Sequence, residues 1–231
     1  MFPLHWELEP RFIPCLLNPD RPGRHHELDV TSAFPLSYPG GEQMTTFRGD
    51  GRSILVGVTG GIATGKSVVA AMLEELGAPS IDFDVLARRV VEPNQPAWHD
   101  IVGFFGESVL AADRTLDRAK LADIVFADAD KRKTLENLTH PRIRGEFEAE
   151  VKAIRGHDPD AIVVAGVPLL IEADMQHLFD HLVVVYAPVE VQVARLMDRD
   201  GLQRGAAETR LRAQLPIDRK TEYADTVIDT S

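Results

Sequence analysis

The sequence of 231 residues contains a single cysteine, Cys15, and has fewer positive than negative side chains. One thiol cannot form an internal disulfide bond, which argues against a disulfide-stabilised secreted domain and favours a reducing, cytoplasmic compartment. The 25 lysines and arginines stand against 36 aspartates and glutamates, giving a formal net charge of −11. Because nucleic acids and anionic membranes repel an acidic protein, neither is an expected partner.

Long apolar runs are also missing. No segment reaches the roughly 18 residues that a membrane span requires, because Gly166 and Pro168 interrupt the best candidate. The basic start and apolar block of a secretory signal are absent as well. Hydrophobic residues make up 44% of the chain and charged residues 26%, which is typical of a globular protein.

Residues 1–52 differ in composition from the rest of the chain. Seven of the 15 prolines lie there and apolar periodicity is lacking, so regular elements are not expected. We interpret this segment as a flexible, Pro-rich extension. A docking arm and a translation start at Met44 are the alternatives, and the sequence does not choose among them. Residues 53–231 are predicted to form one domain.

From Ile54 onward, short apolar runs alternate with helical patterns. Residues 54–59 are β-branched and apolar on both faces, as in a central parallel strand, and residues 68–76 have helical spacing. The other predicted strands are 79–82, 161–165, 182–187 and 226–229. Residues 131–155 are predicted to be helical with a break at Pro141. The alternation predicts a three-layer α/β fold, with helices on both faces of a parallel sheet.

Residues 60–67 (GGIATGKS) fit the pattern G-x-x-x-x-G-K-[ST] between a predicted strand and a predicted helix. Gly60 and Gly65 are expected to adopt backbone angles that a Cβ atom would forbid, so that N–H groups turn toward a phosphate. Lys66 would supply a positive charge to the outer phosphates, and the Ser67 hydroxyl would serve as a ligand for Mg²⁺. The residues expected to bind the nucleoside triphosphate, which would be ATP if the protein is a kinase, are Gly60, Gly61, Ile62, Ala63, Thr64, Gly65, Lys66 and Ser67. A glycine-rich turn without a ligand is the alternative.

Three classes of protein use such a loop: GTPase switches, ATP-driven machines and small-molecule kinases. A GTPase would carry the guanine-reading pattern Asn-Lys-x-Asp, and the chain has no Asn-Lys pair. Its two Asp-x-x-Gly matches, at 100–103 and 198–201, fall in or beside helical patterns. A motor ATPase usually ends a strand in aspartate to hold Mg²⁺, whereas the strand 161–165 continues into Gly-Val-Pro. These observations favour the kinase.

Two carboxylates follow the second predicted strand, at the sheet edge where open α/β sheets bind ligands. Strand alternation predicts that Asp82 and Asp84 lie on the same side of an extended segment. One of them would accept the proton of an acceptor hydroxyl, and the other would hold Mg²⁺ or orient the substrate. The alternative is structural: Asp82 caps a helix at 83–91, and Asp84 favours the positive end of its dipole.

A cluster of arginines lies near the end of the chain. Arg195 and Arg199 are spaced i, i+4, which places them on one face of a helix, and a polar segment with further arginines follows. Those further arginines are Arg204, Arg210 and Arg212. Such a cluster is suited to close over phosphates and exclude water. The alternative is a solvated helix with ion pairs such as that between Glu208 and Arg212.

With these residues in view, the chain from about residue 54 to residue 231 resembles the dephospho-CoA kinase family in a series of motifs that occur in the same order. The loop TGGIATGKS is similar to the family's TGGIGSGKS, and Asp82-Phe83-Asp84 with Ala87-Arg88 is similar to its DAD-x-x-AR. The other shared motifs are Phe105-Gly106, Leu116-Asp117-Arg118 with Leu121, His140-Pro141 with Ile143, Val167-Pro168-Leu169-Leu170-Ile171-Glu172, Gln192 with Arg195-Leu196 and Arg199-Asp200-Gly201, and Gln214 with Lys220 and Ala224-Asp225.

The resemblance implies a nucleotide-kinase-like fold with a five-stranded parallel core, a small lid at about 195–214 and a helical substrate-binding region. It implies an enzyme of the final step of coenzyme A biosynthesis, which phosphorylates the ribose 3′-hydroxyl of dephospho-CoA with ATP and Mg²⁺. Asp84 would be the base, with Asp82 beside it as a further catalytic residue or metal ligand, and Lys66 would assist the transfer. Arg195 and Arg199 would contact ATP. Arg88, Arg118 and His140 would line the dephospho-CoA side, although His140 is equally compatible with a structural role.

Three departures from the family pattern carry expectations of their own. Ala63 adds a Cβ atom to the loop, which is accommodated if its φ angle stays negative. Phe83 replaces a small residue and either narrows the pocket or points into the core. The sequence ends at Ser231, where the family usually continues through a Gly-containing turn that helps to seat adenine, so reduced ATP affinity or stability is expected.

The alternative functions are another P-loop small-molecule kinase and a catalytically weak, nucleotide-binding regulatory module. The sequence does not predict an oligomeric state.

Overall fold

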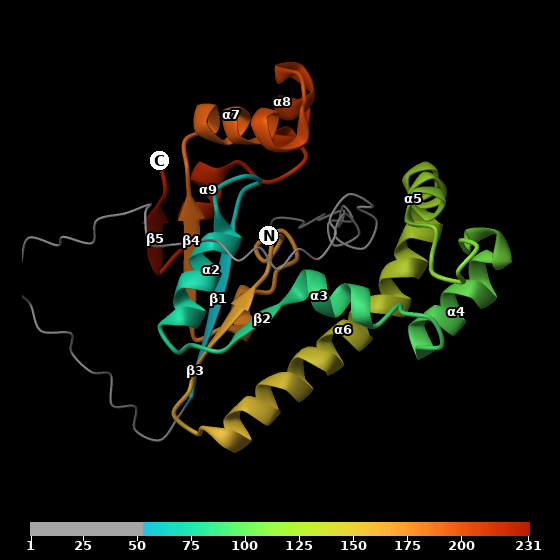
Figure 1. Ribbon diagram of the computed structural model, residues 1–231, viewed down its shortest axis with the longest axis horizontal. Helices are drawn as coiled ribbons and strands as arrows, with labels where there is room; N and C mark the ends of the chain where they lie inside the picture. The colour runs from blue at the N-terminus through green and yellow to red at the C-terminus, as the bar shows by residue number, and fades with distance from the viewer. Residues whose placement is uncertain (1–52) are drawn as a thin grey trace, which may run out of the picture.

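The computed structural model describes residues 53–231 (Figure 1). The predicted Pro-rich extension at 1–52 and the alternative start at Met44 lie outside the described residues. Within the described part of the chain, no helix is both long and apolar enough to cross a lipid bilayer.

Five parallel strands form one sheet in residues 53–231, in the order β2-β3-β1-β4-β5. The strands are β1 (Ile54–Gly60), β2 (Ser80–Asp82), β3 (Ile162–Gly166), β4 (His181–Tyr186) and β5 (Thr226–Asp229). All five predicted strands are confirmed to within one residue at each end. The register pairs Gly60 with Val185 and Asp82 with Gly166. The carboxyl ends of four strands therefore meet at one edge of the sheet.

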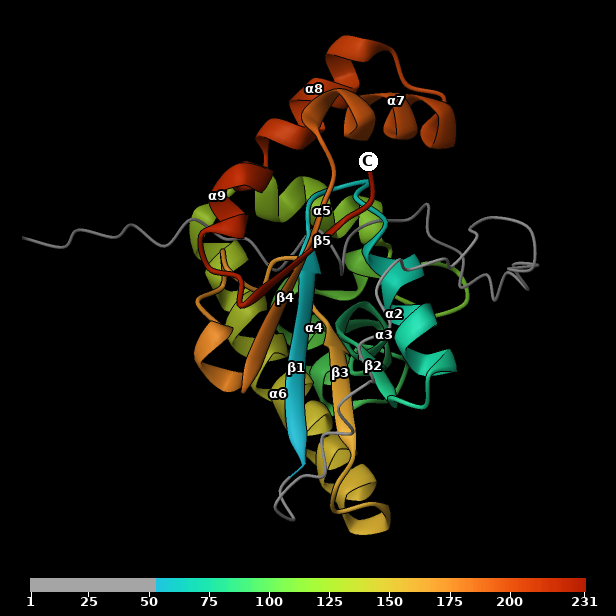
Figure 2. The ribbon, with the colours of Figure 1, turned by 90° about the vertical axis from the view of Figure 1, so that its left-hand side faces the viewer.

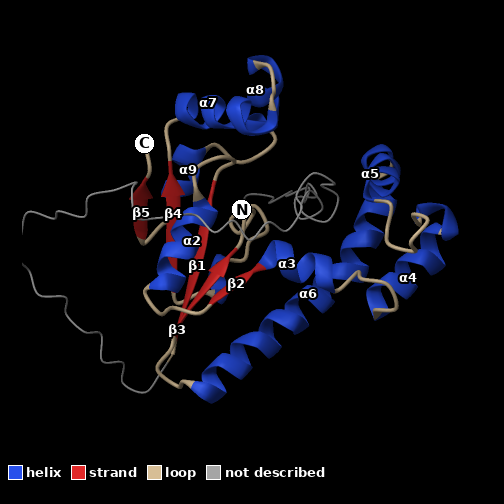
Figure 3. Cartoon of the chain, viewed as in Figure 1, coloured by secondary structure: helices blue, strands red, loops and turns tan. Residues whose placement is uncertain are grey.

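Helices cover both faces of this sheet (Figures 1 and 3). The helices are α2 (Lys66–Glu75), α3 (Phe83–Arg89), α4 (Pro96–Phe105), α5 (Arg118–Ala127), α6 (Ala129–His157), α7 (Val189–Asp200), α8 (Arg204–Arg212) and α9 (Ile217–Thr221), with short 3-10 turns η2 (Glu107–Val109) and η3 (Gln176–Leu178). On β1, Val56 and Val58 face a cluster with Val69 of α2, whereas Leu55 belongs to the larger cluster that includes α3 and α6. This alternation confirms the predicted three-layer α/β fold.

Two groups of helices extend beyond the layers. Helices α7 and α8 lie across the carboxyl ends of the strands, close to the chain's last residue (Figure 2). Helices α4 and α5 pack with the first half of α6 and lie beside the sheet, beyond α3 (Figure 1). The edge of the sheet that carries the phosphate-loop motif is therefore the edge above which α7 and α8 lie.

The predicted helix break at Pro141 is wrong, because α6 runs without interruption from Ala129 to His157. Its buried residues recur every four positions on both sides of the proline, namely Leu135, Thr139, Ile143, Phe147 and Val151. Pro141 itself is exposed, on a different face of the helix. A proline inside a helix removes one backbone hydrogen bond. Packing of the buried stripe outweighs that loss here.

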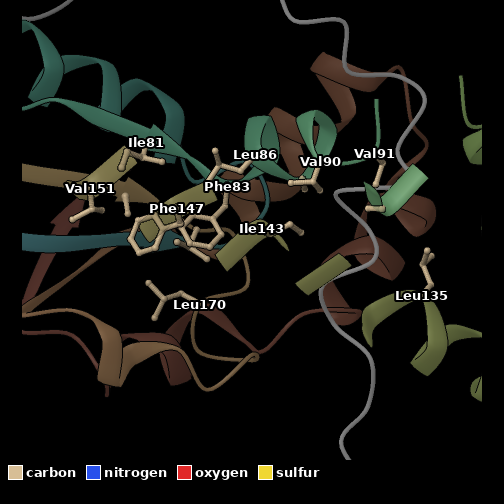
Figure 4. Close-up of a cluster of buried hydrophobic side chains, with 14 of the residues drawn as sticks. Ile81, Phe83, Leu86, Val90, Val91, Leu135, Ile143, Phe147, Val151 and Leu170 are labelled. Carbon is tan, nitrogen blue, oxygen red and sulfur yellow. The ribbon is translucent and has the colours of Figure 1, made fainter. Parts of the chain in front are cut away.

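The large aromatic residue between the two aspartates points into the core. Phe83 is 2% exposed, and its ring centroid lies 4.8 Å from that of Phe147 on α6. Figure 4 shows the two rings side by side, with Ile143 and Leu170 close by. Of the two expectations for Phe83, packing into the core is therefore the one that the structure bears out. The side chain anchors the start of α3, and with it the neighbouring aspartates, to the long helix.

Candidate active site

The loop between β1 and α2 presents backbone N–H groups at the carboxyl edge of the sheet. Gly65 has φ = +88°, a conformation that glycine adopts readily, and it caps α2 without a side-chain hydrogen bond. The N–H groups of Ala63 and Gly65 have no hydrogen-bond partner within residues 53–231. The first N–H groups of α2 have no partner inside the helix either. The loop and the helix end together form a site suited to an anion.

Gly60 is required because there is no room for a side chain at this position. The prediction that it adopts backbone angles forbidden to other residues is wrong. Its φ angle is not in the left-handed region. A Cβ atom there would lie 2.7 Å from the carbonyl oxygen of Val185 and 2.5 Å from Oγ1 of Thr64. A larger residue would therefore push the loop away from β4. At the next position, Gly61, a Cβ atom would meet Oε1 of Gln192 at 2.6 Å, so α7 packs directly against the loop.

Two of the predicted ATP-binding residues use their polar groups inside the protein. Thr64 is fully buried, and its hydroxyl donates to the carbonyl oxygen of Gly61 at 3.0 Å. The N–H group of Ile62 donates to Oε1 of Gln214 at 3.1 Å. The side chain of Thr64 and the N–H of Ile62 thus hold the shape of the loop in this structure.

Ala63 has φ = +60°, so the condition of a negative angle is not met. A left-handed alanine costs about 1–2 kcal/mol. However, Ala63 packs against a small cluster formed by Val193, Leu196 and Ala207 of α7 and α8. The methyl group therefore links the loop to the helices above it, and its burial offsets part of the backbone cost.

The substitution Ala63→Gly is expected to change the free energy of unfolding by less than about 1 kcal/mol. Relief of about 1–2 kcal/mol of backbone strain is opposed by a loss of up to about 0.8 kcal/mol for the half-buried methyl and about 0.4–1 kcal/mol for the added freedom of the unfolded chain. Urea denaturation of the two proteins measures the difference. A gain well above 1 kcal/mol would show that the methyl contact contributes nothing.

Lys66 and the two aspartates lie near one another at the carboxyl edge. A Cβ atom on Gly166, the last residue of β3, would lie 3.3 Å from Nζ of Lys66. Gly166 is also the register partner of Asp82 on β2. The ammonium group therefore lies over the end of β3, next to the strand that carries Asp82 and leads to Asp84.

Asp82 and Asp84 are close because of a helix cap, not because of strand alternation. Helix α3 begins at Phe83, and Oδ1 of Asp82 accepts the N–H of Asp84 at 2.7 Å. This confirms the capping interpretation for Asp82. Asp84 occupies the first turn of α3 and is 7% exposed. A buried carboxylate beside a phosphate loop is more than capping requires, since a charge that only favours a helix dipole is usually exposed.

Arg195 reaches the loop through the last strand. Its guanidinium donates to the carbonyl oxygen of Thr230 at 2.6 Å and to the Thr230 hydroxyl at 3.2 Å. That hydroxyl in turn donates to the carbonyl oxygen of Thr64 at 2.7 Å. Arg195 is thus held close to the phosphate loop by one intervening residue.

The other arginines of the cluster are engaged in ion pairs. Nε of Arg199 and Nη1 of Arg210 bind the carboxylate of Asp200, at 2.7 and 2.8 Å. Arg204 binds Glu190 and Glu208, and Arg212 lies 3.8 Å from Glu208. The predicted Glu208–Arg212 pair is therefore confirmed. Although Arg195 and Arg199 share a helix, only Arg195 is linked to the loop in this structure.

The three residues assigned to the acceptor side lie on α3, α5 and α6. Arg88 and Arg118 are half-buried. Burial and then the positive charge of Arg88 lower the pKa of Arg118 below its usual value, so the two guanidinium groups lie near each other. Desolvation lowers the pKa of His140, which favours a neutral imidazole at neutral pH, even though part of the residue remains exposed. Two neighbouring cations suit an anionic group.

Four residues of the site were not predicted from single positions in the sequence. Gln214 and Thr230 bond to the loop, as described above, and Lys220 and Glu172 form a buried ion pair beneath it. Gln214, Lys220 and Glu172 lie in the family motifs, and those motifs are the only indication in the sequence that these three residues belong to the site. Nothing in their local sequence indicates burial.

The side-chain oxygens near the loop suit a metal ion that is bound together with the phosphates of a nucleotide. Within residues 53–231, no group of three or more His, Cys, Asp or Glu side chains could hold a metal by itself. The oxygen donors present are the exposed hydroxyl of Ser67 in the first turn of α2 and the carboxylate of Asp82. Mg²⁺ typically takes one or two protein oxygens and completes its shell with phosphates and water, so these residues fit it.

Known proteins provide an independent comparison. A model of a family described as dephospho-CoA kinase matches residues 54–231. A dephospho-CoA kinase from Geobacter metallireducens is 49% identical over 176 residues, which cover 76% of this chain and 87% of the relative. A solved structure from Thermus thermophilus is 35% identical with a TM-score of 0.69, covering 78% and 90% of the two chains. The dephospho-CoA kinase from Campylobacter jejuni is 29% identical with a TM-score of 0.57, covering 77% and 88%.

Proposed function

The chain belongs to the dephospho-CoA kinase family, and we propose that it transfers the γ-phosphoryl group of ATP to the ribose 3′-hydroxyl of dephospho-CoA. This reaction is the final step of coenzyme A biosynthesis and gives CoA and ADP. The observation that supports it best is the buried Asp84 beside the phosphate loop, at the edge where Lys66 also lies. The single cysteine supports a cytoplasmic location as part of the same proposal.

The loop holds the triphosphate and Asp84 activates the acceptor. The N–H groups of Ala63 and Gly65 and those at the start of α2 bind phosphate oxygens, and Lys66 neutralises charge on the transferred group. Asp84 accepts the proton of the 3′-hydroxyl as its oxygen attacks phosphorus. The Asp84 N–H is bonded to Asp82, which fixes the first turn of α3 and so orients the base.

Ser67 would hold Mg²⁺, with Asp82 as a second oxygen donor. When bound there with ATP, the ion neutralises phosphate charge. Arg195 and Arg199, within a lid at about 195–214, supply further positive charge over the phosphates. The neighbouring guanidinium groups of Arg88 and Arg118 bind anionic groups of dephospho-CoA, and His140 supports that side.

The reaction is tested by ADP release from Mg-ATP with and without dephospho-CoA, using adenosine and common nucleosides as comparison acceptors. We expect strong stimulation by dephospho-CoA alone, with CoA as the product. Stimulation by another acceptor alone would assign a different P-loop small-molecule kinase. ATP binding without stimulation by any acceptor would favour the nucleotide-binding regulatory module.

A further inference from the structure

A fully buried lysine lies directly beneath the phosphate loop. Lys220 of α9 is 0% exposed, although lysine is among the residues least often buried in proteins. Its Nζ donates to the carbonyl oxygens of Gly60 and Pro168, each at 3.2 Å, and lies 2.9 Å from Oε1 of Glu172. Three oxygens thus match the three donors of an ammonium group. Gly60 is the residue at which β1 ends and the loop begins.

The partner carboxylate is equally buried and fixes a second segment. The side chain of Glu172 is 0% exposed, and Oε1 also accepts the N–H of Leu215 at 3.1 Å. Gln214, the residue before Leu215, accepts the N–H of Ile62 through its side-chain oxygen. Residues 214–220 therefore contact the phosphate loop at two places, its first carbonyl and its third residue.

We infer that Lys220 is a positioning residue for the phosphate loop, holding the Gly60 carbonyl so that the following N–H groups are directed at the triphosphate. An ion pair that served stability alone would not require a bond to the loop, and burying charges is a costly way to stabilise a fold. Because a carbonyl and the next N–H belong to one rigid peptide unit, fixing the oxygen of Gly60 fixes the N–H of Gly61. This inference rests on the proposed function only in that ATP is the nucleotide bound.

The test compares two variants that share a neutral residue at position 172. In Glu172→Gln, the Lys220 amine remains available to bond the Gly60 carbonyl. In Lys220→Met/Glu172→Gln, that bond is lost, and neither variant buries an unpaired carboxylate. Titration calorimetry with Mg²⁺ and a non-hydrolysable ATP analogue measures affinity without any acceptor. A wrong assignment of dephospho-CoA as the acceptor therefore leaves this result unaffected. Thermal unfolding of both variants is followed in parallel.

We expect the double variant to bind the analogue at least tenfold more weakly than Glu172→Gln, because misplacement of a binding group by about 1 Å is enough for large losses. Equal affinities, with or without a difference in melting temperature, would overturn the inference and leave Lys220 a purely structural residue. If the double variant does not fold, Gln214→Leu decides. Gln214 is half-buried and is the other anchor, and its loss should weaken analogue binding severalfold. Unchanged affinity in that variant would count against positioning by residues 214–220.

Discussion

Replacement of Asp84 by asparagine is expected to lower kcat by a factor of about 100 to 10,000, the usual contribution of a positioned base. Asparagine keeps the shape of the side chain, and the backbone N–H bonded to Asp82 is unaffected. The amide cannot accept the hydroxyl proton. Because Asp84 is not part of the loop that holds the phosphates, ATP affinity should stay within about threefold. Steady-state kinetics and calorimetric titration with ATP measure the two effects separately.

A control distinguishes loss of a base from a general effect of removing negative charge. Asp123 is exposed on α5, remote from the loop in sequence and fold, and Asp123→Asn should retain the parent kcat. If ATP affinity in Asp84→Asn instead falls as far as kcat, the carboxylate acts mainly as a metal ligand. That outcome would transfer the role of base to Asp82.

The single substitution Lys220→Met is expected to destabilise the protein by about 3–5 kcal/mol. It removes the ammonium group and leaves the carboxylate of Glu172 in a fully buried position, where the N–H of Leu215 is its one remaining donor among residues 53–231. Urea denaturation monitored by circular dichroism measures the loss.

The second substitution Glu172→Gln should restore most of the stability lost in Lys220→Met, because it removes the uncompensated charge. A loss below about 1 kcal/mol in the single variant would mean that the site readily hydrates or neutralises the carboxylate. Failure of the second substitution to restore stability would place the cost in packing rather than in charge.

Much of the fold could be predicted because its central strands β1, β3 and β4 are buried on both faces. Residues 54–59 form a nearly continuous apolar run, and only strands at the centre of a parallel sheet need such runs. The break at Pro141 was predicted from a local rule, and the rule failed because α6 keeps buried residues at four-residue spacing on both sides of the proline. Tertiary packing, which local propensity does not include, decided the outcome.

The candidate site was predictable where chemistry follows a contiguous motif and not where distant segments meet. The loop and the pair Asp82 and Asp84 were found from spacing, although the pair is close for a different reason. Gln214 and Lys220 lie in a polar stretch that reads as solvated surface. Their burial depends on contacts with residues 152 and 160 positions earlier in the chain, which no local pattern records.

The separation of these anchors along the chain has a consequence for synthesis. The loop is made early, whereas the residues that fix it follow 152, 160 and 166 positions later, counting the hydroxyl of Thr230 on the carbonyl of Thr64. A chain still emerging from the ribosome therefore has the nucleotide-binding motif without its supports. Because contacts between such distant residues form slowly, nucleotide binding should arise only in the last stage of folding. Nascent chains that lack α9 and β5 would then not compete with the finished enzyme for ATP.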